Sequence, residues 1–100
     1  MPAVDLVNPK NPVVAVSFSP HIWAHLLELW QRHAPRLEEL SGVQRHWIIP
    51  LTGDPTLSKP QWEAVQSTLL IFARKNPQHR DWISQASLEI TQQVKTQNGP

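Results

Sequence analysis

The sequence contains no cysteine and only three glycines among its 100 residues. Without cysteine the chain forms neither a disulfide framework nor a thiolate metal site, and it has no cysteine nucleophile. With so few glycines it contains no glycine-rich phosphate-binding loop, and neither G-x-S-x-G nor G-x-G-x-x-G occurs. These absences exclude the common sequence signatures of nucleotide-binding proteins and serine hydrolases. We therefore expect a protein that is not an enzyme and that has no cofactor.

Long apolar runs are missing as well. The longest bulky run, residues 69–73, is far shorter than the roughly 20 residues that cross a bilayer. The N-terminus also lacks the basic start and apolar stretch of a signal peptide. We expect a cytoplasmic protein with no membrane partner.

Charge of either sign is scarce. The chain has nine Lys and Arg residues and eight Asp and Glu residues, which gives a formal net charge of +1. Because non-specific nucleic-acid binding depends on many cationic contacts, this balance predicts weak binding at most. Tryptophan, by contrast, is abundant, with five residues. A tryptophan fills a core and anchors an interface equally well, so the count alone does not separate these roles.

Apolar residues at helical spacing predict three helices, over residues 20–41, 59–75 and 77–94. Ser19-Pro20 is typical of a helix start, with serine in the capping position and proline in the first turn. A short Asn-Pro turn separates the second and third helices, which should form a hairpin. The predicted fold class is mainly α.

The first two helices carry further signals. Pro35 removes a backbone hydrogen bond inside the first helix and predicts a kink near that residue. Ser58 and Gln61 form a capping box at the start of the second. The apolar stripe predicted for the first helix comprises Trp23, Leu26, Leu27, Trp30, Ala34 and Leu37.

Two segments, residues 13–18 and 43–49, are extended in character. If they pair across the first helix, they form a parallel βαβ crossover, and the fold becomes a small α+β unit of βαβαα order. Alternatively, both pack as extended chain without a sheet. We expect one globular domain over residues 13–94, preceded by an extended arm at 1–12 and followed by a flexible tail at 95–100.

A pair of histidines, His21 and His25, lies one helical turn apart, with Glu28 one turn further on. Such side chains are able to face one metal ion. However, the zinc-protease motif H-E-x-x-H requires glutamate directly after the first histidine, and this sequence has Ile22 there. We therefore predict no native metal site and keep the three residues as weak candidates.

A basic cluster occurs where the second and third helices meet. It comprises Arg74, Lys75, His79 and Arg80. Such a cluster is suited to gripping a phosphate, which makes a nucleic-acid-binding regulator the alternative function. Cations at a helix C-terminus also complement the helix dipole, so an ordinary structural role explains Arg74 and Lys75.

Our leading hypothesis is a small adaptor or regulatory module that binds another protein, or itself, through an apolar surface rich in tryptophan. The predicted core face of the second helix comprises Trp62, Val65, Leu69, Phe72 and Ala73. Ile71 points away from that face, as an interface residue would. The candidate interface residues are Ile71, Trp62, Trp47 and Trp82.

Overall fold

The computed structural model describes residues 13–98, with side chains described as far as residue 96. The predicted arm 1–12 therefore lies outside the described residues. Within residues 13–98, four helices, one 3-10 turn and two short strands follow one another. In order they are β1 (Val13–Ala15), α2 (Pro20–Ser41), α3 (Arg45–Ile48), β2 (Thr56–Ser58), α4 (Lys59–Lys75), η1 (Pro77–His79) and α5 (Arg80–Asn98). The predicted mainly α fold is confirmed.

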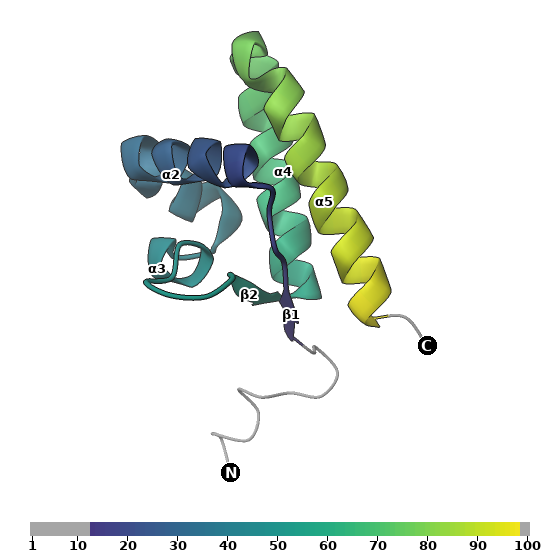
Figure 1. Ribbon diagram of the computed structural model, residues 1–100. Coiled ribbons are helices and arrows are strands. Elements are labelled where there is room, and N and C mark those ends of the chain that lie inside the picture. The colour runs from purple at the N-terminus through teal and green to yellow at the C-terminus, as the bar shows by residue number, and fades with distance from the viewer. Residues whose placement is uncertain (1–12, 99–100) are drawn as a thin grey trace.

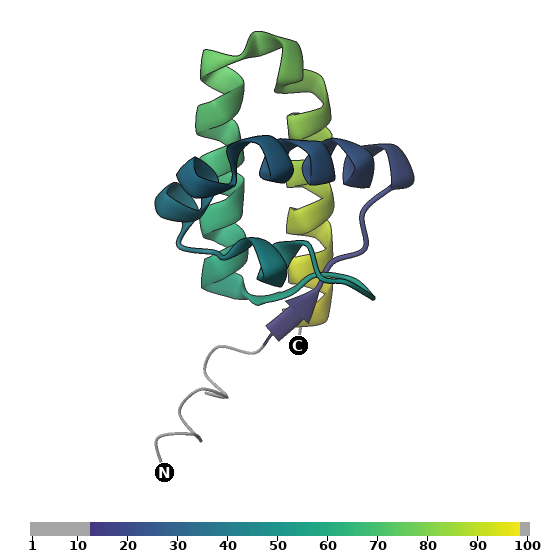
Figure 2. The ribbon, with the colours of Figure 1, turned by 90° about the vertical axis from the view of Figure 1, so that its left-hand side faces the viewer.

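Helices α4 and α5 form the predicted hairpin, and α2 lies across both of them (Figures 1 and 2). The side chain of Gln66 links the hairpin by donating to the Ser87 carbonyl at 2.9 Å and to Thr91 Oγ1 at 2.7 Å. The α5 helix reaches Asn98, beyond the predicted end at residue 94. The face of α5 that packs on the core buries five apolar residues: Trp82, Ile83, Ala86, Ile90 and Val94.

The predicted sheet is wrong in its partner and direction. β1 pairs antiparallel with β2, with Val14 opposite Leu57, so no parallel βαβ crossover forms. Most of the segment 43–49 is not extended, because residues 45–48 form the short helix α3. Val43 and Ile48 are both buried, and a helical turn between them brings both side chains to the core.

The kink in α2 is confirmed. His33 has φ −124° and ψ 25°, outside the helical region, two residues before Pro35. The proline lacks the N–H that would continue the ladder of helical hydrogen bonds, so the helix turns at this point. Gly42 then ends the helix in the left-handed conformation at φ 72°, where a residue without Cβ fits best.

The capping signals have different outcomes. Ser58 and Gln61 form the predicted capping box at the start of α4. Ser19 occupies the predicted capping position of α2, but its side chain makes no capping hydrogen bond. It binds Glu89 of α5 instead. The N-terminal end of α2 is thus held by another helix rather than by its own first turn.

The core lies where α2, the hairpin and the strand pair meet. The stripe of α2 is rotated from the prediction, because Ile22 and Leu29 are buried whereas Trp23 and Leu27 are only partly covered. On α4 the predicted face is buried except for Phe72, which is half-buried, and Thr68 joins it. Large buried side chains of this kind each contribute about 1.5–3 kcal/mol to stability.

Candidate protein-binding site

An apolar notch lies between the second half of α2 and the C-terminal half of α4. Its volume is about 160 Å³. Leu40 and Ile71 are its exposed apolar residues, at 47% and 43% of their full surface, and the half-buried Phe72 lies between the two helices. The residues that line the notch are His33, Arg36, Leu37, Leu40, Ile71, Phe72, Lys75 and Asn76. We call this the α2–α4 notch.

The charged residues of the α2–α4 notch are all basic. Arg36 and Lys75 are exposed, and the ring of His33, also exposed, lies 5.3 Å from the ring of Phe72 between centroids. Within the described side chains, no carboxylate lines the notch. The amide of Asn76 donates to the Phe72 carbonyl at 3.1 Å and is therefore engaged in ending α4. The result is an apolar floor with a cationic rim.

The kink in α2 creates the notch. After the break at His33, the helix continues against α4, which brings Arg36 and Leu40 beside Ile71. The sequence pattern marked Ile71 as unexplained by the core, but it gave no sign of Leu40 as its neighbour. Leu40 stands outside the predicted stripe, directly before the Ser41-Gly42 helix end, and only the direction of the bent helix shows where it lies.

The four tryptophan and isoleucine candidates separate into two groups. Trp62 is fully buried, and its Nε1 donates to the Val14 carbonyl at 2.9 Å. Trp82 is buried too, with its Nε1 donating to His79 Nδ1 at 2.9 Å. Both rings fill the core. Trp47 and Ile71 remain as exposed residues, but Trp47 lies on α3 and does not line the notch.

Five rings in stacked, tilted or edge-on contact connect α2 with the junction of α4 and α5. His25 stacks on Trp82 at 5.1 Å, Trp82 meets His79 at 6.1 Å, and His79 meets Phe72 at 5.4 Å. Phe72 in turn contacts His33. Because Trp82 donates to its Nδ1, His79 belongs to this ring array, and its side chain is only partly exposed.

The other residues of the predicted basic junction, Arg74, Lys75 and Arg80, are exposed. Of these only Lys75 lines the α2–α4 notch. The structure adds Arg32 and Arg36 of α2 to the same part of the molecule, next to the ring array. Arg32 is partly neutralised by Glu28, whose carboxylate lies 3.5 Å away. This grouping depends on the packing of α2 against the hairpin and was not visible in the sequence.

The histidine pair of α2 does not gather a ligand set. His25 is stacked on Trp82, and Glu28 pairs with Arg32. His21 lies near the carboxylate of Glu89 at the start of the helix. Among the described residues, no group of three or more His, Asp or Glu side chains is arranged to hold a metal ion.

Two larger hollows have mixed rims. A groove of about 420 Å³ between the start of α4 and the end of α5 has Lys59, Glu63 and Lys95 at its edge. A second hollow, of about 640 Å³, lies between α3 and the following loop and includes Glu38 and Arg45. Both hollows contain cations as well as carboxylates, so neither has a rim of one charge sign, as the α2–α4 notch has.

No protein-family model matches the chain, and comparison with curated proteins and with solved structures gives no significant match. None of the helices within residues 13–98 combines the length and apolar character needed to span a membrane.

Proposed function

We propose that this chain is a non-enzymatic cytoplasmic adaptor, which binds a partner protein at the α2–α4 notch. The partner segment carries a bulky apolar side chain flanked by carboxylates. The observation that supports this function is the exposed pair Leu40 and Ile71 beside the cationic residues Arg36 and Lys75. An apolar anchor fills the notch, while acidic neighbours meet the rim.

The energetics favour a modest, reversible interaction. Burying one large apolar side chain contributes about 1.5–3 kcal/mol, and the exposed surfaces of Leu40 and Ile71 lose water at the same time. Rim charges such as Arg36 and Lys75 mainly accelerate association and select partners of opposite sign, because they keep much of their hydration. Affinity is therefore expected to depend on the apolar anchor, and selectivity on the rim.

The chemistry of the notch supports binding rather than catalysis. His33 is the only lining side chain, among those described, that commonly serves as a general base. No serine, threonine or carboxylate lines the notch with it, so the described residues there form neither a nucleophile–base pair nor a pair of carboxylates. The rim cations remain available for ionic contacts with a partner.

The proposal is tested with two short labelled peptides, each with a central leucine, one flanked by glutamates and the other by lysines. The glutamate peptide should bind the full chain and shift the amide NMR signals of Leu40, Ile71 and Phe72. Ile71→Asp should abolish the binding, whereas Leu70→Asp should not. Leu70 is a matched control, because it is 46% exposed on the same helix but does not line the notch.

Charge reversal sharpens the result. Replacing Arg36 and Lys75 together by glutamate should weaken binding of the glutamate peptide and strengthen binding of the lysine peptide. Equal binding of both peptides to the unmodified chain would contradict selection by the rim. Signals that move only outside the α2–α4 notch would refute the notch as the binding site.

A nucleic-acid-binding regulator is the second candidate function. The exposed Arg74 and Arg80, together with Arg32 of α2, favour it. Anisotropy of a labelled duplex should then fall steeply between about 50 and 200 mM salt, because phosphate contacts release counterions. Arg74→Ala with Arg80→Ala should reduce that binding, and Lys59→Ala, at the far end of α4, serves as the control. Undetectable binding at low salt would exclude this function.

A further inference from the structure

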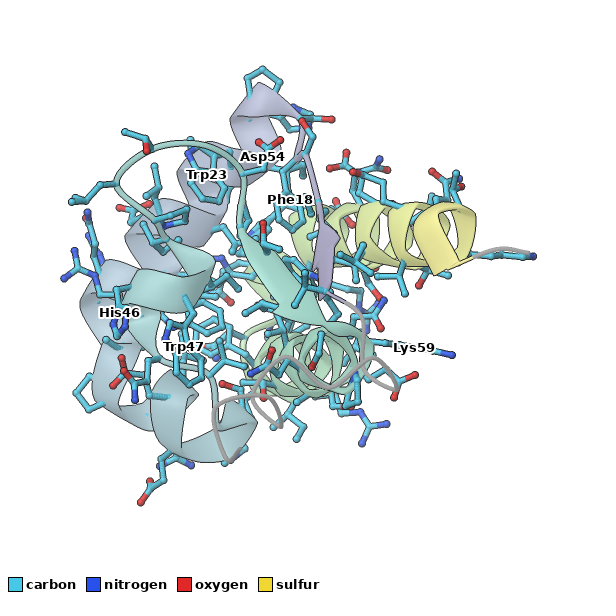
Figure 3. All side chains as sticks on the ribbon, turned by 90° about the horizontal axis from the view of Figure 1, so that it is seen from below. Phe18, Trp23, His46, Trp47, Asp54 and Lys59 are labelled. Carbon is cyan, nitrogen blue, oxygen red and sulfur yellow. The ribbon has the colours of Figure 1, made fainter. Side chains whose placement is uncertain are left out.

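The loop between α3 and β2 presents a leucine directly to solvent. Leu51 is 104% exposed, as open as in an extended peptide and more than any other large apolar side chain among the described residues. In Figure 3 this loop arches outward from α3, where His46 and Trp47 are labelled, toward Asp54. An apolar side chain in such a position gains nothing from the fold of its own chain.

The loop is held in place rather than hanging free. Val16 donates its backbone N–H to the carbonyl of Pro55 at 3.1 Å, and Pro55 itself is buried. The hydroxyl of Thr56 donates to the Asp54 carbonyl at 3.3 Å. At the other end, the Ile49 N–H donates to the Arg45 carbonyl at 2.7 Å. Because both ends are fixed, little ordering entropy opposes docking of the loop.

The loop and the α2–α4 notch are complementary. Leu51 offers a bulky apolar side chain, and Asp54, three residues further on, offers an exposed carboxylate. The notch offers apolar Leu40 and Ile71 with cationic Arg36 beside them. The same chain thus carries an apolar side chain with one carboxylate beside it and a notch with an apolar floor and a cationic rim, which meets in part the chemistry proposed above for the partner.

We propose that a second copy of this chain occupies the α2–α4 notch, with Leu51 inserted between Leu40 and Ile71 and Asp54 facing the cationic rim. This inference builds on the proposed function and names its partner. Arg45, on the α3 side of the loop, carries the same charge as the rim. Repulsion there orients the approach so that the Asp54 side leads.

The contact is small. One loop in one notch buries far less than the roughly 1,000 Å² of a stable interface, so the assembly is weak and depends on concentration. The same contact formed twice around a two-fold axis gives a closed dimer, because each copy then provides one knob and one notch. A contact that does not close would instead give open chains of copies.

Sedimentation velocity over a concentration series tests the inference with the full chain. Wild type should self-associate, and Leu51→Asp and Ile71→Asp should each weaken the association about tenfold or more, equivalent to about 1.4 kcal/mol. Leu88→Asp is the matched control, because Leu88 is 49% exposed on α5 and belongs to neither the loop nor the notch. Circular dichroism should show that all three variants stay folded.

Mixing the two variants gives the decisive result. Leu51→Asp retains an intact notch and Ile71→Asp retains an intact loop, so one good contact forms in the mixture but none in either variant alone. Association recovered on mixing supports the inference. If the copies instead associated through one surface that contacts the same surface of the second copy, the mixture of variants would stay dissociated. That outcome would overturn the inference.

A peptide of residues 48–56 separates failure of this inference from failure of the proposed function. It should shift the Leu40 and Ile71 signals of wild type and of Leu51→Asp, but not of Ile71→Asp. If wild type is strictly monomeric and does not bind this peptide, a second copy is not the partner. If it still binds the glutamate-flanked peptide, the notch keeps its proposed function with a different partner. If it binds neither, both fail.

Discussion

Ser19 donates two hydrogen bonds to the carboxylate of Glu89, one from its backbone N–H to Oε1 at 3.0 Å and one from its hydroxyl to Oε2 at 2.6 Å. The two residues are 70 positions apart, so the pair joins the start of α2 to α5. Gln85 donates to the same carboxylate at 3.1 Å. Ser19 stands in the capping position of α2, but its side chain binds α5 and so holds the two helices together.

Replacing Ser19 by alanine should lower the free energy of unfolding by about 1.5–3 kcal/mol, because a hydrogen bond to a charged group is lost in a partly buried position. Urea unfolding followed by circular dichroism measures the change. Ser17→Ala is the control: its backbone bonds to Gln93, but its exposed side chain makes no such bond to that residue. If both variants lost the same free energy of unfolding, the bond from the Ser19 hydroxyl to Glu89 would not contribute specifically to stability.

Stability should fall in acid through the same pair. Burial alone raises the pKa of the Glu89 carboxyl, but the bonds from Ser19 and Gln85 and the nearby His21 outweigh it and hold the pKa below its ordinary value of 4.5. A group with a depressed pKa stabilises the fold above its ordinary pKa and loses that effect as pH falls through the folded-state pKa. Urea midpoints should therefore drop below about pH 4.5.

Glu89→Gln tests that assignment, because glutamine has about the same shape and does not titrate. The variant should be less stable than wild type at neutral pH, and the difference should shrink as the solution becomes acidic. A constant difference across the whole pH range would mean that other carboxylates cause the acid sensitivity.

Two nearby positions on α4, one exposed and one buried, should differ strongly in how much stability a new charge removes. Ile71→Asp should change the free energy of unfolding by about 0.5 kcal/mol or less, as at ordinary surface sites. Leu69→Asp should unfold the chain, because Leu69 is fully buried and a charge there loses its hydration without a partner. Thermal melts followed by circular dichroism distinguish these outcomes, and a folded Leu69→Asp would contradict the packing described for α4.

Two buried tryptophans differ in how their N–H groups are satisfied. Trp62 donates to the Val14 carbonyl, whereas Trp30 Nε1 has no hydrogen-bond partner among the described residues. Trp62→Phe should therefore cost about 1 kcal/mol more than Trp30→Phe, since it removes a formed bond and leaves a buried carbonyl without that donor. Chemical unfolding of both variants gives the difference. A larger loss for Trp30→Phe would contradict this account.

Local signals in the sequence predicted local structure well. Pro35 predicted the kink, and Ser58 and Gln61 predicted the capping box, because each signal acts within one helical turn. The strand pairing was wrong for the opposite reason. β2 is three residues long with only Leu57 buried, so it carries no alternating pattern to detect, and its pairing with β1 is decided by tertiary packing.

The site was predictable only in part. Ile71 was identified because it lies off the apolar face of its own helix, which is a property of one segment. Leu40 and Arg36 lie beside Ile71 only because α2 bends, and a pattern within one segment does not predict contacts between two helices. Leu51 follows the segment 43–49, which was predicted to be extended, and its exposure depends on α3 forming a helical turn before it.

The pairing of β1 with β2 also bears on the order in which the chain folds. Val13 meets Ser58 only after α2 and α3 have been enclosed in a long loop, whereas α4 and α5 meet across a short turn. Closing the long loop costs more entropy, so the α4–α5 hairpin should form early and the strands should join late. Leu57→Ala should then speed unfolding in stopped-flow experiments while leaving the refolding rate nearly unchanged.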